Sequence, residues 1–69
     1  MITINQIQLK LSETIKLSGI SQREIGEAIG LCQQSISAYV NGHRFPSLDT
    51  LANLCKVLDI DANYILCLD

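Results

Sequence analysis

The segment GLCQQSISAYVNG (residues 30–42) joins a glycine-containing turn to a short helix with an unusual surface. Ile36 and Val40 recur at helical spacing and predict the side of this helix that faces the core. The other side carries Gln33 and Gln34 at its start, followed by small side chains and no charge. A core helix has no use for two neighbouring glutamines, and a solvated helix usually carries more charge. The segment therefore predicts a helix that forms hydrogen bonds with a partner molecule.

The whole chain has 69 residues, which is enough for one domain, and we expect that domain to span residues 1–69. Hydrophobic residues make up 48% of it, which argues against disorder. No apolar run approaches the roughly 20 residues that span a bilayer, and the start of the chain is unlike a signal peptide. We therefore expect a cytoplasmic protein without a membrane partner.

The cysteines predict free thiols. Cys32, Cys55 and Cys67 are odd in number and lack paired spacing, which is typical of a reducing compartment. There is no CxxC motif, and only His43 could join them, so we expect no metal site and no cofactor. No Ser–His–Asp set, carboxylate pair or glycine-rich phosphate loop is visible, and we expect no enzymatic activity.

Apolar residues follow helical spacing through nearly the whole chain, and no alternating pattern predicts a strand. Local sequence signals mark where five helices begin and end. Those that begin a helix are capping boxes at Thr3–Gln6 and Ser21–Glu24 and single caps at Ser47 and Asp61. Those that end one are Gly19, Gly30 and Gly42. The expected fold is an all-α, compact five-helix bundle with helices at residues 4–17, 22–29, 33–40, 48–58 and 62–66.

The turn at residues 30–32 lies between two short helices, which is typical of a helix-turn-helix motif. In that motif the second helix enters the DNA major groove, where side chains read base edges. Glutamine pairs with adenine, hydroxyl groups bond either donors or acceptors, and an alanine methyl packs on thymine. The candidate base contacts are therefore Gln33, Gln34, Ser37 and Ala38.

Three further residues are candidates for phosphate contacts. Gln22 lies at the start of the preceding helix, whose free N–H groups attract phosphate. Asn41 and Arg44 follow the second helix of the motif. Alternative interpretations stay open, because Gln22 also fits a generic polar residue, Asn41-Gly42 also fits a helix stop and Arg44 also fits an ordinary surface charge.

The run SQREIGEAIGLCQQSISAYVNGHRFPSLDTLANLCKVLDIDANYIL (residues 21–66) resembles the Cro/CI-type (phage-repressor, XRE-like) helix-turn-helix domain. The resemblance implies a lambda-repressor-like bundle that binds operator DNA, usually as a homodimer. It assigns base contacts to Gln33 and Gln34 and further base-facing positions to Ser37 and Ala38. It assigns backbone contacts to Gln22, Asn41 and Arg44, with Gln22 also able to brace the first glutamine.

The sequence departs from the family pattern at several positions. Ile15 and Val40 stand where the family often pairs an arginine with a buried acid; exchanging both for apolar residues is often neutral or stabilising. Gly26 stands where alanine is favoured, at a cost of roughly 0.5–1 kcal/mol unless helices pack more closely there. Cys32 occupies a capping position and should cap weakly. Its thiol is either an inert side chain or a redox sensor beside Gln33.

The net charge of the chain bears on two hypotheses about its function. The chain has a formal net charge of −2 and a pI near 5.1, whereas nucleic-acid binders are usually basic. Residues 1–46 hold four cations and three carboxylates, and residues 47–69 hold one cation and four carboxylates. We therefore expect any phosphate-facing surface in the first two thirds. The favoured function is a small DNA-binding regulator, a repressor. The alternative is a protein-interaction module, an antitoxin-like or anti-repressor partner that binds DNA weakly or not at all.

Overall fold

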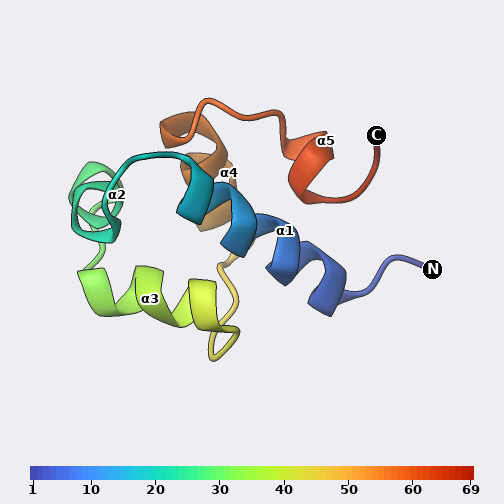
Figure 1. The fold of residues 1–69 in the computed structure, drawn as a ribbon, viewed down its shortest axis with the longest axis horizontal. Coiled ribbons are helices and arrows are strands. Elements are labelled where there is room, and N and C mark those ends of the chain that lie inside the picture. Colours follow the sequence, from blue (N-terminus) through green and yellow to red (C-terminus); the bar gives the residue numbers. More distant parts are fainter.

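The computed structural model describes residues 1–69 and contains five helices and no strand (Figure 1). The helices are α1 (Ile4–Leu17), α2 (Gln22–Ile29), α3 (Gln33–Asn41), α4 (Leu48–Val57) and α5 (Ala62–Ile65). The predicted bounds of α1 and α2 are confirmed. The structure extends α3 by one residue and shortens α4 and α5 by one each. The all-α five-helix prediction is therefore confirmed.

Two of the predicted helix starts form as expected. The Thr3 hydroxyl accepts the Gln6 N–H at 3.3 Å, and the Gln6 side chain accepts the Thr3 N–H at 2.8 Å, which completes the capping box. At α5 the Asp61 carboxylate accepts the Asn63 N–H at 2.9 Å. Each bond satisfies one of the N–H groups that a helix start leaves without a partner.

Two other starts differ from the prediction. The Ser21 hydroxyl accepts the Glu24 N–H, but the Glu24 carboxylate accepts the same hydroxyl's proton instead of the Ser21 N–H, so only half of that box forms. At α4 the Ser47 hydroxyl donates to the Asp49 carboxylate at 2.5 Å and makes no bond to a helix N–H. Ser47 is therefore the first flanking residue of α4, as predicted, but its hydroxyl oxygen accepts no helix N–H.

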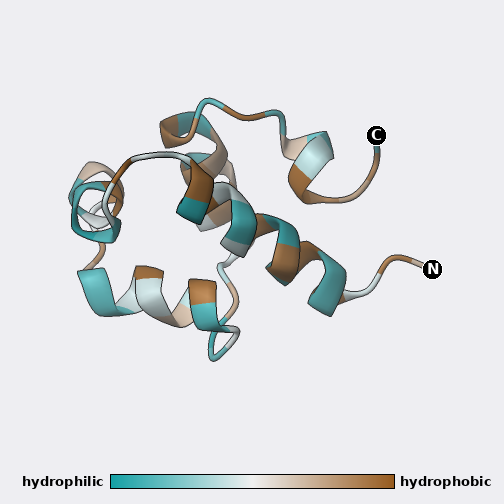
Figure 2. Ribbon diagram, viewed as in Figure 1, coloured by the Kyte–Doolittle hydropathy of each residue, from teal (hydrophilic) through white to brown (hydrophobic).

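All five helices contribute to one core (Figure 1). α1 crosses the middle of the molecule, with α3 packed on one side and α5 on the other, while α4 packs against α2. Figure 2 shows hydrophobic and hydrophilic residues alternating along the helices, as expected when one side of each is buried. Ile15 and Val40, at the positions of the absent ion pair, are both buried in the core. The core members are Leu11, Ile15, Ile25, Ile36, Tyr39, Val40, Leu54, Cys55 and Ile65.

None of the five helices combines the length and apolar character that a membrane crossing requires.

Candidate nucleic-acid interface

The turn between α2 and α3 depends on two glycines. Gly30 ends α2 with a φ of 77°, in the left-handed region that favours glycine. The next N–H, that of Leu31, donates back to the Gly26 carbonyl at 2.8 Å. A Cβ atom on Gly26 would lie only 2.6 Å from the Leu31 carbonyl oxygen. The close packing expected to offset a glycine within α2 is therefore present, and it is the turn backbone that approaches.

At the start of α3 Cys32 makes no side-chain bond to a helix N–H, which confirms the weak cap. Its Sγ instead lies 3.4 Å from the Ser35 Oγ, and the Ser35 side chain is buried. This hydrogen bond, together with backbone N–H groups of the first turn, holds the pKa of the exposed Cys32 thiol below its usual value. The backbone N–H groups at the start of α3, next to Gln33 and Gln34, therefore have no capping side chain as a hydrogen-bond partner.

The candidate base-contact residues lie together on the outer side of α3. Gln33 and Gln34 are exposed, and Ser37 and Ala38 are partly exposed further along. The Asn41 side chain lies one turn beyond Ser37 and donates to its hydroxyl at 3.3 Å. Ser37 therefore accepts a bond within the helix and keeps its own proton for another acceptor. The result is a surface of amides, one hydroxyl and one methyl, without a charged side chain.

The candidate phosphate contacts flank this surface. Gln22 is partly exposed in the first turn of α2, where helix N–H groups point outward. Arg44 is exposed beyond Gly42, which ends α3 at a φ of 77°. The His43 and Arg44 N–H groups donate to the Ala38 carbonyl at 2.9 and 3.3 Å. These bonds fold the segment back onto the end of α3, so the position of Arg44 follows that of the helix.

The cations near α2 and α3 differ in their surroundings. Arg23 pairs with Glu27 one turn along α2, at 3.1 Å. Arg44 makes no ion pair, and its side chain borders an apolar groove of about 130 Å³ between α1, α4 and the segment after α3. Arg44 is therefore available to an anion, and it also lies beside an apolar surface that the sequence did not predict.

Gln8 is a second feature that sequence reasoning missed. Its side-chain Nε2 on α1 donates to the carbonyls of Tyr39 and Val40, at 3.2 and 3.0 Å, near the end of α3. The donor and acceptors are 31 and 32 residues apart in the chain, so no local pattern could have found this bond.

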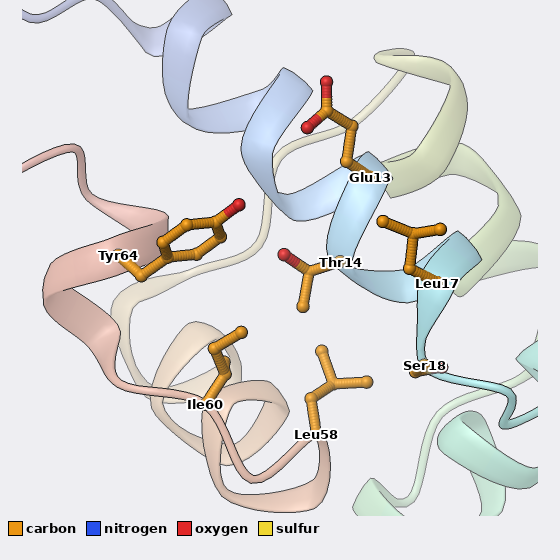
Figure 3. Close-up of a pocket in the computed structure, with 7 residues that line it drawn as sticks. All are labelled: Glu13, Thr14, Leu17, Ser18, Leu58, Ile60 and Tyr64. Atoms are coloured by element: carbon orange, nitrogen blue, oxygen red, sulfur yellow. The ribbon is translucent and has the colours of Figure 1, made fainter.

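A pocket of about 220 Å³ lies on another part of the molecule, between α1 and the connection from α4 to α5 (Figure 3). Leu58 and Ile60 form its apolar floor, and Figure 3 shows the Glu13 carboxylate directed away from them. The Thr14 hydroxyl is already bonded to the Lys10 carbonyl at 2.8 Å. No set of polar groups converges in this pocket. The chain also holds no cluster of three or more His, Cys, Asp or Glu side chains suited to a metal ion.

Comparison with known protein families supports a helix-turn-helix motif formed by α2, the turn and α3. A family model described as Helix-turn-helix matches residues 11–65, from within α1 to the end of α5. Searches of the curated proteins and of the solved structures found no match to the chain. The family match covers well over half of the chain and includes α2, the turn and α3, which carry the candidate interface. The chain belongs to the Cro/CI/XRE-type helix-turn-helix family, a family of DNA-binding transcription regulators.

Proposed function

We propose that this protein binds a specific double-stranded DNA sequence and acts as a small transcriptional repressor. The observation that carries the proposal is the uncharged hydrogen-bonding surface of α3, exposed beside the turn that defines the family. Base pairs are distinguished in the major groove by their donors and acceptors, and amide and hydroxyl side chains can read these without adding charge.

In this proposal α3 enters the major groove with its N-terminal end foremost. Gln33 and Gln34 contact base edges, with Ser37 and Ala38 at the next positions along the helix. The phosphate contacts come from Gln22, Asn41 and Arg44 on either side. Few cations take part, so the salt dependence of binding should be shallow for a DNA-binding protein.

We further propose that the DNA-bound form is a homodimer joined through the apolar groove. Exposed side chains of Ile4, Phe45 and Leu48 line this groove, and the partly buried Leu66 forms part of its wall. Half-sites one turn apart are separated by about 34 Å, and the molecule measures 33 × 23 × 22 Å, so neighbouring copies are close enough to touch.

The test of DNA binding is selection of random duplexes by the purified protein at about 50 mM salt, followed by sequencing. A two-fold motif with half-sites one turn apart is expected. Gln34→Ala should then relax preference at one or two base pairs, while Arg44→Ala should weaken binding to all duplexes alike. Asn53→Ala, at an exposed position of α4, is the matched control and should change neither property. No enrichment of any sequence would refute the proposal.

The competing function is a protein-interaction module that keeps the fold. The specific observation that favours it is the combination of net negative charge with an exposed apolar groove. Leu48→Ser separates the two functions because it removes apolar surface without altering α3. Loss of the dimer with retained weak half-site binding supports the DNA-binding homodimer. Capture of a different protein by wild type but not by Leu48→Ser, without duplex enrichment, supports the interaction module.

A further inference from the structure

The Gln8 side chain connects α1 to the end of α3 by two hydrogen bonds. Both protons of its Nε2 are used, one on the Tyr39 carbonyl at 3.2 Å and one on the Val40 carbonyl at 3.0 Å. The carboxamide lies directly over Gly42, where a Cβ atom would be 3.3 Å from its carbon. A side chain at position 42 would therefore press on the group that makes both bonds.

The carbonyls that Gln8 contacts have few other donors. The last carbonyls of a helix have no partner within it. At α3 the Ala38 carbonyl accepts the N–H groups of His43 and Arg44, and the Tyr39 carbonyl accepts a long 3.4 Å bond from Gly42. The Val40 carbonyl receives its hydrogen bond from Gln8. Gln8 thus completes the end of α3 from a different helix.

The two ends of α3 are held differently. Its N-terminal end follows the α2–α3 turn, which packs against Gly26 so closely that a Cβ atom there would overlap the Leu31 carbonyl. Along its length Ile36 packs in the aliphatic core, and apolar contacts of this kind are not directional. At the C-terminal end the bonds from Gln8 are the directional link between α3 and α1.

We infer that Gln8 is a positioning residue for DNA binding: it fixes the end of α3, and with it the segment that carries Asn41 and Arg44, relative to the rest of the bundle. The inference rests on the proposed DNA-binding function. Gln8 itself contacts no DNA in this scheme. Its effect reaches the DNA through Arg44, whose N–H is bonded to the same last turn of α3.

The experiment is a double-mutant cycle on the duplex selected by wild type. Gln8→Met keeps the length of the side chain and removes both donors. We expect it to raise Kd roughly 3- to 10-fold, as for the weakening of one hydrogen-bonded contact to the DNA. Combined with the pair Asn41→Ala and Arg44→Ala it should have less than about a two-fold effect, because the contacts that it positions are already absent. Combined with Gln22→Ala, on α2, it should keep its full effect.

One control variant and one further measurement separate positioning from simple loss of stability. Ile60→Val trims a partly buried side chain in the α4–α5 connection and should lower stability without changing Kd at temperatures well below unfolding. Amide relaxation measurements should show faster motion of residues 41–44 in Gln8→Met but not in Ile60→Val. Equal effects of Gln8→Met in all three backgrounds, or an unchanged Kd, would overturn the inference.

A different set of results is expected if the protein does not bind DNA. If wild type enriches no duplex, DNA binding is refuted, and the relaxation measurement alone decides the role of Gln8. Unchanged motion of residues 41–44 in Gln8→Met would then overturn the positioning role as well. Increased motion would retain Gln8 as the residue that orders this segment for whichever partner it contacts.

Discussion

Replacing Gly26 with alanine sets two opposed free-energy terms against each other. Alanine is favoured over glycine within a helix by roughly 0.5–1 kcal/mol, and the family favours alanine here. The new Cβ, however, would lie 2.6 Å from the Leu31 carbonyl oxygen, whereas real Cβ contacts stay beyond 3.0 Å. The turn cannot retreat freely, because the Leu31 N–H is bonded to the Gly26 carbonyl at 2.8 Å.

The clash should outweigh the helix preference. Forcing an extra methyl into a packed site typically costs about 1–3 kcal/mol, so Gly26→Ala should destabilise the fold by about 0.5–2 kcal/mol. For a domain of this size, that corresponds to a fall in Tm of roughly 3–12 °C. Thermal and urea unfolding measure it directly. Because the displaced backbone leads into Gln33, weaker DNA binding should accompany the loss of stability.

A control in the same helix calibrates the favourable term. Ala28 is exposed on α2, so Ala28→Gly should report the helix preference alone and lower stability by up to about 1 kcal/mol. If Gly26→Ala instead raises stability by as much as Ala28→Gly lowers it, then the close approach of the turn is not a real constraint.

Three further predictions concern the helix start and the thiols. Thr3→Ala should lower the free energy of unfolding by about 1 kcal/mol through loss of the α1 cap, while Thr3→Ser should keep most of it; equal urea midpoints for the two would contradict this. Iodoacetamide should modify Cys32 first, because this thiol is exposed and the bond to Ser35 lowers its pKa. Cys55 is buried and should react only on unfolding. Peptide mapping that finds equal rates of modification would disprove this order. Burial raises the pKa of Cys55 above the unfolded thiol value of 9.0, so its contribution to stability is complete below about pH 9 and is lost as pH rises further. Cys55→Ala should therefore flatten the alkaline decline of stability, and an unchanged slope would count against this assignment.

The features that the sequence predicts well are those set by neighbouring residues. Thr3 with Gln6 and Asp61 with Asn63 act over two or three residues, and their hydrogen bonds form as the pattern predicts. Gly30 marks a position where the backbone needs a positive φ, which a single residue type signals. Helix bounds therefore agree within one residue.

The sequence predicts hydrogen bonds less accurately where a polar side chain has more than one possible partner. The Ser47 hydroxyl bonds the Asp49 carboxylate, and the Glu24 carboxylate takes the Ser21 hydroxyl rather than its N–H. Both alternatives lie within three residues, so the sequence shows the candidate partners but not which of them forms the stronger bond. The helices begin at the predicted residues all the same, because packing of their apolar sides contributes more than the caps.

Features that depend on contacts between distant segments were not predictable. Gln8 lies on α1 among other polar residues, and nothing nearby distinguishes it as the donor to carbonyls 31 and 32 residues away. The groove beside Phe45 likewise exists only because α1 and α4 approach the segment after α3. For the same reason, the sequence could name Arg44 as a candidate but not show that it lies between the end of α3 and this groove.

The distribution of cations argues that affinity and specificity come from different parts of this molecule. Lys10 lies 4.3 Å from the centre of the Tyr64 ring, and Arg23 pairs with Glu27, so two of the five cations already have partners. Each phosphate neutralised contributes to affinity and to its salt dependence, and one copy of this chain can neutralise few. The amides of α3 can select a sequence without adding charge. In the proposed dimer, a second copy would double the phosphate contacts on one duplex, which would link the proposed dimer groove beside Arg44 to the proposed DNA-reading surface of α3.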